Sequence, residues 1–261
     1  MITWNSFLYW AIPTFVLSVV GSVLSLRSDK RSYAAVFATL TAVCVLSGFV
    51  AGLWTSLERP PLRTMGETRL WYSLFMLIAG LFTYIRWGFR WILSFSTLVS
   101  TVFLVINILR PDIHDRSLMP ALQSPWFIPH VTVYIFSYSV LGCAFLLGLY
   151  NLHYKKKDLL PVADNLVHIG LCFLTLGMLF GSLWAKEAWG RYWSWDPKET
   201  WAVITWVGYL LYIHLRLMWP KLRIWACVLL ILSFVGLQIC WYGVNYLPSA
   251  QNSVHAYTRG S

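Results

Sequence analysis

The sequence predicts an all-α fold: a polytopic integral membrane helical bundle of about eight transmembrane helices with one external tryptophan-rich loop. Hydrophobic residues make up 58% of the 261 residues and charged residues only 11%, and the mean hydropathy is +0.62, far from the composition of a soluble domain. The apolar residues form runs of roughly the 20 residues that a spanning helix needs. These runs lack the alternation with a period of two that the strands of a membrane β-barrel require.

Eight apolar runs are the expected spans. Most are separated by charged segments: Arg27–Arg31 follows the first, Arg86 and Arg90 flank the gap between the third and fourth, and Lys155–Lys157 lie between the fifth and sixth. The third run is the shortest. In chain order the spans are Phe7–Leu26, Tyr33–Trp54, Leu70–Ile85, Trp91–Leu109, Ile128–Tyr150, Leu166–Ala185, Trp201–Met218 and Ile224–Tyr246.

The basic residues predict the orientation in the membrane. If the amino terminus is outside, the inner loops hold eleven basic and three acidic residues, and the outer segments hold nine and seven. The blocks Arg27–Arg31 and Lys155–Lys157 lie in short inner loops, where the positive-inside rule is most reliable. We therefore expect both termini and the tryptophan-rich loop on the non-cytoplasmic side. Because the charges lie between spans, the net charge of +10 indicates membrane topology and no nucleic-acid partner.

Other features favour a single membrane domain over residues 1–261. The longest loops have about 15 to 18 residues, and no low-complexity linker is present. No Lys or Arg precedes the first run and no small-residue cleavage site follows it, so we expect this span to be retained. The five cysteines are scattered within spans without a CxxC or CxxCH motif, which is typical of small core residues.

The most informative stretch is Trp184–Trp206, WAKEAWGRYWSWDPKETWAVITW, which contains six tryptophans. Indole rings gather at membrane interfaces, and this tendency explains roughly two or three of them. Trp189, Trp193 and Trp195 alternate with small or polar residues and lie beside Gly190, which permits close approach of a ligand. We therefore expect these rings to form a platform for a large planar ligand.

Asp196 lies at a predicted helix start. It precedes Pro197, and Glu199 follows in what would be the first turn, which is the usual order of a cap, a first-position proline and an acidic residue. The sequence therefore predicts Asp196 as the cap of the seventh span. Its carboxylate also offers acceptors to indole N–H groups, so a role in orienting the tryptophans is compatible with capping.

The string WGRYWSWDPKETWAVITW, followed by YIHLR, resembles the WWD signature of the cytochrome c assembly superfamily, whose members handle haem. It is more similar to the CcsA or ResC type of System II cytochrome c biogenesis than to the related CcmC and CcmF proteins of System I. The resemblance is strongest over residues 122–261, and the WWD loop corresponds to residues 184–206. The first four spans match only in general hydrophobic character.

Two histidines lie at outer ends of the predicted topology, His130 in QSPWFIPHVTVY and His255 in NSVHAY. Both can reach the tryptophan-rich loop without crossing the hydrocarbon, and neutral imidazoles are standard axial ligands of haem iron. The resemblance implies that these two histidines flank the WWD loop as the axial ligands of haem b. It also implies that the cofactor-binding residues of the loop include Trp189, Trp193, Trp195 and Asp196.

Of the remaining histidines, two lie within predicted spans and two lie at or beyond span ends. An ionisable residue within a span, such as His214, by default indicates a pathway or site, and the resemblance implies that His214 is an iron ligand where haem enters the bundle. His168 has a similar depth in the sixth span and is expected mainly to pack, although it could face His214. His153 and His114 are expected to be solvated.

The resemblance implies the haem-handling subunit of a cytochrome c synthase. Such a subunit conducts haem across a bacterial cytoplasmic or thylakoid membrane, as a transported substrate, and presents it for thioether attachment to the CxxCH motif of apocytochrome c. The implied partner is a CcsB- or ResB-type membrane subunit, and haem lyase activity is expected only in complex with it. The protein supplies positioning, since the organic chemistry belongs largely to the porphyrin. Lys186 and Arg191 are candidates to pair with haem propionates.

Two other functions remain open from the sequence. A diheme b-type electron carrier would pair His168 with His214 on the inner side and His130 with His255 on the outer side. A membrane transferase acting on a lipid-linked glycosyl or phosphoryl group would use Asp196 and Glu199 as paired carboxylates. The first needs no tryptophan platform, and the second competes with the capping role of the same residues.

Overall fold

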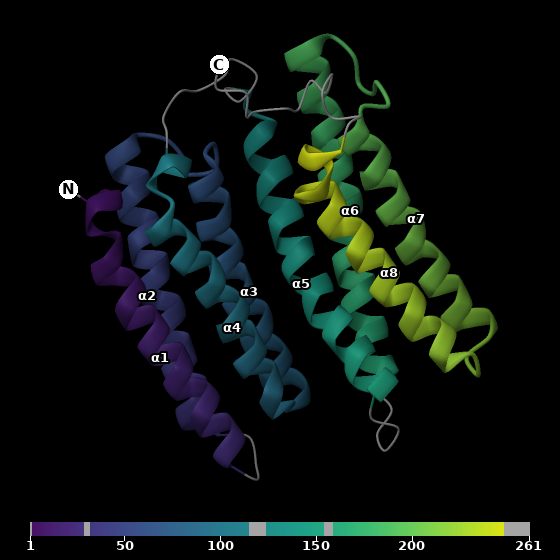
Figure 1. The fold of residues 1–261 in the computed structure, drawn as a ribbon, viewed down its shortest axis with the longest axis horizontal. Coiled ribbons are helices and arrows are strands. Elements are labelled where there is room, and N and C mark those ends of the chain that lie inside the picture. Colours follow the sequence, from purple (N-terminus) through teal and green to yellow (C-terminus); the bar gives the residue numbers. More distant parts are fainter. Residues whose placement is uncertain (1, 29–31, 115–123, 154–158, 248–261) are drawn as a thin grey trace. The chain divides into compact units, whose positions relative to one another are not determined.

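The computed structural model describes residues 2–28, 32–114, 124–153 and 159–247, and these are all-helical (Figure 1). Eight helices in these ranges are long and apolar enough to cross a membrane, which confirms the predicted fold class and a multi-pass membrane protein. Contacts divide the chain into two compact units, Met1–Gln123 and Ser124–Ser261, called unit 1 and unit 2 below. A single domain over the whole chain stays a prediction.

Unit 1 is a four-helix arrangement in which each helix packs on two others. Helix α1 contacts α2 and α4, and α3 contacts the same two helices. The core includes Leu46, Phe49 and Leu70, which are fully buried. The helices are α1 (Phe7–Arg27), α2 (Tyr33–Leu57), α3 (Met65–Trp87) and α4 (Arg90–Leu109), with 3-10 turns η1 (Trp4–Ser6) and η2 (Pro111–His114).

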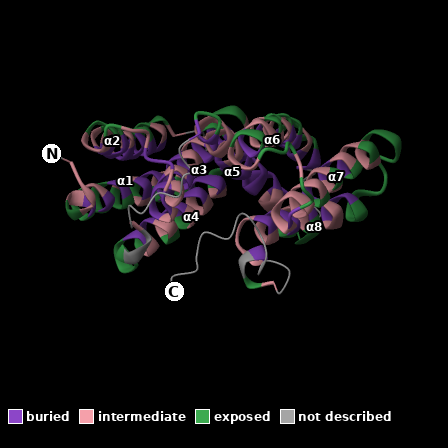
Figure 2. Cartoon of the chain, turned by 90° about the horizontal axis from the view of Figure 1, so that it is seen from above, coloured by how far each residue is buried: buried purple, intermediate pink, exposed green. Residues whose placement is uncertain are grey.

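Unit 2 repeats this pattern of neighbours. Helix α5 contacts α6 and α8, and α7 contacts the same two helices. In both units the buried positions lie on the helix faces that meet neighbouring helices (Figure 2). The helices are α5 (Phe127–His153), α6 (Leu160–Trp189), α7 (Pro197–Met218) and α8 (Arg223–Trp241), with a final 3-10 turn η4 (Gly243–Tyr246).

The third helix begins earlier than the expected Leu70 because of a capping box. The Thr64 hydroxyl accepts a hydrogen bond from the backbone N–H of Glu67 at 3.2 Å, and the Glu67 carboxylate accepts one from the N–H of Thr64 at 3.1 Å. Such a reciprocal pair satisfies amides that have no partner within the helix. It therefore adds a polar first turn that hydrophobic runs alone do not reveal.

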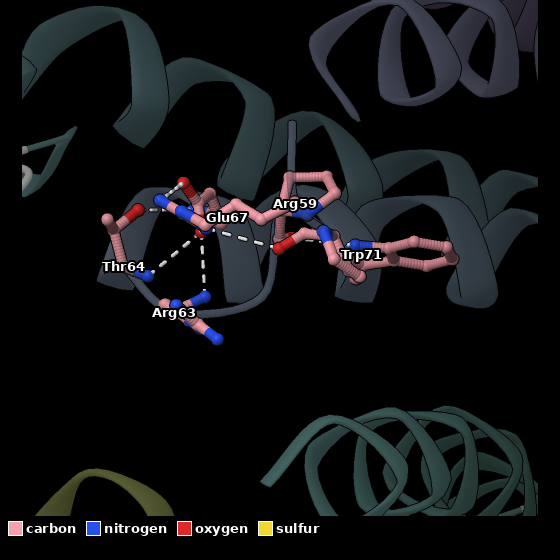
Figure 3. A network of polar contacts seen from close by, with 7 residues as sticks. Arg59, Arg63, Thr64, Glu67 and Trp71 are labelled. Carbon is pink, nitrogen blue, oxygen red and sulfur yellow. Dashed lines mark hydrogen bonds and ion pairs between the residues drawn. The ribbon is translucent and has the colours of Figure 1, made fainter. Parts of the chain in front are cut away.

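The Glu67 carboxylate is only 1% exposed and is the centre of a polar network (Figure 3). Arg59 donates to both of its oxygens, at 2.8 and 3.0 Å, and the backbone N–H of Arg63 donates at 2.7 Å. Burial lowers the pKa of the Arg63 guanidinium; neighbouring Arg59 lowers it further, and Glu67 raises it. One turn along α3, the Trp71 indole N–H donates to the carbonyl of Pro61 at 2.8 Å. The loop before α3 is thus fixed to the helix.

Two expectations about individual residues are wrong. His114 is half-buried and stacks on Trp4, with ring centroids 3.8 Å apart and an angle of 7° between the planes, where a solvated side chain was expected. Cys44 and Cys172 lie on exposed helix faces, whereas Cys143, Cys227 and Cys240 are buried as expected. Helix periodicity places some apolar or small residues on the outer face, and in a membrane protein that face meets lipid.

Candidate functional site

The tryptophan-rich segment is more helical than the sequence suggested. Helix α6 continues to Trp189 and ends at Gly190, whose φ of 76° is the left-handed conformation that glycine adopts without a steric penalty. Helix α7 begins at Pro197. Only residues 190–196 form the connection, so Trp184 and Trp189 project from the last turns of α6.

Asp196 caps α7, as predicted. Its carboxylate accepts a hydrogen bond from the N–H of Lys198 at 3.0 Å, Pro197 occupies the first position, and Asp196 is buried. The Glu199 side chain completes the capping box by accepting from the N–H of Asp196 at 3.1 Å. These bonds use the carboxylates that a transferase would need as acid and base. The further role of Asp196 in orienting indoles stays a prediction.

Glu199 also holds the short connection. Its carboxylate accepts from the N–H of Ser194 at 2.8 Å, in addition to that of Asp196, so it binds the backbone on both sides of Trp195. Trp195 has a φ of 57°, which costs a residue with a Cβ about 1–2 kcal/mol. Its indole is 66% exposed. The Glu199 bonds therefore maintain a strained backbone that presents one tryptophan to the surroundings.

The tryptophan rings meet edge to face. Trp184 and Trp189 have centroids 4.8 Å apart at 64°, and Trp193 and Trp195 are 5.8 Å apart at 85°. Such angles follow from the charge distribution of aromatic rings. Neither pair therefore forms a continuous plane. A platform for a large planar ligand stays a prediction.

His130 lies in the first turns of α5, and its ring packs against Trp184 and Tyr134, which together with Trp189 form an aromatic cluster. Its Nδ1–H donates to the backbone carbonyl of Gly177 on α6, at 2.8 Å. Its ring stacks on Trp184, with centroids 5.4 Å apart at 26°, and meets the ring of Tyr134 edge to face at 4.7 Å. Because a carbonyl can only accept, Nδ1 carries the proton, and in the neutral ring Nε2 keeps the lone pair that binds a metal.

A polar link fixes the start of α5 beside the end of α6. The Ser124 hydroxyl accepts from the N–H of Trp126 at 3.2 Å and donates to the Glu187 carboxylate at 2.6 Å. Ser124 is buried. This contact places His130 at the same end of unit 2 as the tryptophan-rich connection.

Four residues of this site were not among the individual binding residues predicted from the sequence: Trp184, Tyr134, Gly177 and Gly181. Of these, only Trp184 lies within the predicted WWD loop. Trp184 is only 3% exposed and lies between His130 and Trp189. The available signal was helical spacing, because positions 177, 181 and 184 fall on one face of α6. The identity of the facing residues on α5 was not accessible without the packing.

His214 lies in α7 on an exposed apolar face. That face includes Ile204, Val207, Leu211 and Met218, at the spacing of three and four residues that aligns side chains along a helix. The Nδ1–H of His214 donates to the carbonyl of Leu210 in the same helix at 2.8 Å. Nε2 is again the nitrogen that keeps a lone pair in the neutral ring.

His168 and His214 belong to different faces. The Asp164 carboxylate of α6 accepts hydrogen bonds from Tyr212 at 2.7 Å and from Arg216, whose closest contact is 2.8 Å, so these two residues define the side of α7 that meets α6. His214 is two positions from each, about 200° around the helix. It therefore points away from the α6 contact, and the inner pair required by a diheme carrier is not brought together within unit 2.

The second predicted axial ligand, His255, lies outside the described residues. Among the residues that the structure does describe, no group of three or more His, Cys, Asp and Glu side chains is arranged to hold a metal ion. The described part of the site thus contains the imidazole of His130, the tryptophan side chains, and the connection 190–196 between α6 and α7, which hydrogen bonds to Glu199 hold in place.

The fold and this site define a multi-pass helical membrane protein with a histidine built into an aromatic cluster between spans. Comparison with known families matches residues 62–250 to the family described as "Cytochrome C assembly protein". The chain belongs to this cytochrome c assembly family, which confirms the resemblance found in the tryptophan-rich segment. The matched region includes α3 and α4 as well as α5 to α8.

Curated relatives are described as "Cytochrome c biogenesis protein CcsA". The protein of Cuscuta reflexa is 33% identical, over 84% of this chain and 83% of the relative. That of Pelargonium hortorum is 30% identical over 84% of each chain. That of Mesostigma viride is 35% identical over 56% of this chain and 60% of the relative. This chain is therefore a cytochrome c biogenesis protein similar to CcsA.

Proposed function

We propose that this chain is the haem-handling subunit of a cytochrome c synthase. Haem b, the transported substrate, enters beside His214 on the cytoplasmic side and is presented at the WWD loop on the opposite side. There the two thiols of a CxxCH apocytochrome c each add S–H across one vinyl C=C bond. A C–S bond forms, the other vinyl carbon takes the hydrogen, and no group leaves.

The observation that carries this proposal is the setting of His130. Its Nδ1–H is held by Gly177, and its ring stacks on Trp184 at the base of the family's signature segment. A histidine that ligates a metal usually donates its other N–H to a carbonyl or carboxylate, which fixes both ring orientation and tautomer. His130 has this arrangement, so its Nε2 is suited to be one axial ligand, and His255 is the proposed second.

The chain's own residues then bind, orient and shield the substrate. The aromatic side chains of Trp189, Trp193 and Trp195 exclude water from the macrocycle. Lys186 lies beside the connection, where its amine donates to the carbonyl of Gly190 at 2.9 Å and lies 5.4 Å from the ring centroid of Tyr192. This position is suitable for a cation that pairs with a haem propionate at the edge of the site.

The exposed apolar face of α7 that carries His214 supports the binding of a partner subunit at the end of unit 2 away from the tryptophan-rich connection. An imidazole in an apolar stripe is costly in lipid and is expected to be paired with a second group. A CcsB- or ResB-type membrane subunit supplies that second group, an iron ligand opposite His214. Synthase activity then belongs to the complex, with membrane lipid around it.

The test is the absorption spectrum of the complex purified in detergent after co-expression with such a partner. His130→Ala and His255→Ala should each lower the haem content or shift the haem bands, because each removes one axial nitrogen. Added imidazole should restore the bands by replacing the missing ligand. Unchanged spectra in both variants would refute the site.

The matched control is His168→Ala, which removes an exposed histidine of α6 that has no role in this proposal. Its spectrum should equal that of the unmodified protein. Loss of one haem in this variant, together with reversible redox cycling of two haems and no dependence on apocytochrome, would favour the diheme carrier. Purification without haem, together with transferase activity that requires Asp196, would favour the lipid-linked transferase.

A further inference from the structure

Helices α5 and α6 approach closely at two glycines of α6. Gly177 and Gly181 are one turn apart and therefore lie on the same face. A Cβ at position 177 would lie 2.8 Å from Cδ1 of Tyr134, and one at position 181 would lie 2.8 Å from both Cε1 and Nδ1 of His130. Both distances are shorter than atoms of this kind tolerate. Tyr134 and His130 of α5 therefore occupy the space beside Gly177 and Gly181 that larger residues of α6 would fill.

Because Gly181 has no side chain, the backbone carbonyl of Gly177 is accessible to His130. Within a helix the carbonyl of residue 177 points toward residue 181, with which it shares the usual helical hydrogen bond. Because residue 181 is glycine, the imidazole of His130 also reaches this oxygen, at 2.8 Å. A carbonyl has two lone pairs and can accept both bonds. Any side chain at position 181 would overlap the imidazole that makes the second bond.

Contacts on the remaining sides restrict the ring of His130. Trp184 stacks on it and Tyr134 meets it edge to face. Tyr134 in turn lies over Gly177, so Tyr134, Gly177, Gly181 and Trp184 surround the imidazole. These contacts fix the ring plane, and the Gly177 carbonyl fixes the proton on Nδ1.

We propose that Gly177 and Gly181, together with Tyr134, are positioning residues that hold His130 in the Nδ1–H form with Nε2 directed to the substrate iron. This inference rests on the proposed function of His130 as an axial ligand. Groups of this kind, which contact the ligand and not the metal, typically change metal affinity by about 10–100-fold. A methyl group at position 181 therefore lowers haem affinity because it displaces the imidazole of His130, in addition to any effect of its volume on helix packing.

Gly170 offers a matched control in the same interface. A Cβ there would lie 2.5 Å from Cδ2 and 2.6 Å from Cγ of Leu141, an overlap at least as large as that at position 181, but with an apolar side chain away from His130. Both changes add one methyl group between α5 and α6. They differ in whether that methyl group displaces the imidazole.

The first experiment measures haem affinity and absorption spectra of the full chain in complex with its partner. Gly181→Ala should lower haem affinity about 10–100-fold, and added imidazole should restore the bands. Gly170→Ala should retain the spectrum of the unmodified protein. Normal haem binding by Gly181→Ala, or an equal loss in both glycine variants, would overturn the proposal.

The second experiment is independent of haem and is made on the unmodified protein. Nitrogen NMR of the haem-free protein with labelled histidine should show the neutral ring of His130 protonated on Nδ1, and His130→Ala assigns the signal. Protonation on Nε2 would overturn the inference. If His130→Ala leaves haem binding intact, the proposed role of His130 as an axial ligand fails, whereas the NMR result still decides the tautomer. If His130→Ala loses haem and Gly181→Ala does not, only the positioning role fails.

Discussion

In three of the described histidines, Nδ1–H donates to a backbone carbonyl, but the carbonyl lies in the same helix in two of them and in a neighbouring helix in the third. His168 and His214 each donate from Nδ1 to the carbonyl four residues earlier in their own helix. His130 donates to Gly177 of a neighbouring helix. A bond within one helix moves with that helix, whereas a bond between helices fixes the side chain relative to a second element. His130 is therefore the one of these three whose ring is positioned by tertiary packing.

At the residue scale, Glu199 is expected to hold Trp195 in place. Glu199→Ala removes the acceptor of the N–H groups of Ser194 and Asp196 and should cost about 1 kcal/mol of stability, the usual effect of losing a helix cap. Amide hydrogen exchange of residues 190–196 should become faster. Glu187→Ala is the control, because that carboxylate bonds to Ser124, and it should leave exchange in this segment unchanged. Equal exchange in both variants would contradict the role.

The positive φ of Trp195 gives a second prediction at this scale. Trp195→Ala and Trp195→Gly both remove the indole, but only glycine adopts a φ of 57° without steric cost. The glycine variant should therefore have the higher free energy of unfolding, by about 1 kcal/mol. Equilibrium unfolding in detergent measures the difference. If the alanine variant is as stable as the glycine variant, the segment does not hold this conformation in solution.

At the scale of elements, polar helix starts determine where spans begin. Helices α3 and α7 both begin with capping boxes, formed by Thr64 with Glu67 and by Asp196 with Glu199. Asp196 before Pro197 was recognisable from the sequence. The role of Glu67 was not, because its main partner Arg59 lies eight residues away across a turn whose path the sequence does not define.

Glu67→Gln tests how strongly this network stabilises unit 1. Glu67 is buried and its charge is matched by Arg59, so its neutralisation leaves an uncompensated guanidinium and should cost about 3–5 kcal/mol. Glu58→Gln removes the same charge at an exposed position nearby and should change stability by less than about 0.5 kcal/mol. Thermal unfolding in detergent compares the two. A similar small effect of both would show that the pair does not stabilise the fold.

At the scale of the whole molecule, the chain divides into two units, and the described residues of each form four consecutive long helices. In each unit the first helix packs on the fourth, so that four successive antiparallel spans close on themselves. The described histidine and tryptophan residues of the proposed site all belong to unit 2. Unit 1 has a separate core and its own buried ion pair.

The proposed orientation is tested with reporter fusions to the full chain. If both termini are non-cytoplasmic, alkaline phosphatase fused after Ser261 should be active, and a green fluorescent protein fused there should be dark when exported through the general secretory route. Reporters inserted beside Lys155–Lys157 should give the opposite result, because this block follows the positive-inside rule. The reverse pattern would invert the proposed path of haem.

The sequence alone determined the membrane fold, the succession of eight helices, the cap at Asp196 and the family, because hydropathy, periodicity and a dense local motif are properties of neighbouring residues. Packing decided that His130 bonds to Gly177 and stacks on Trp184, and that His168 and His214 lie on different faces. These relations join residues separated by tens of positions. They depend on the rotation and approach of whole helices, which side-chain volumes across an interface determine and a linear pattern does not encode.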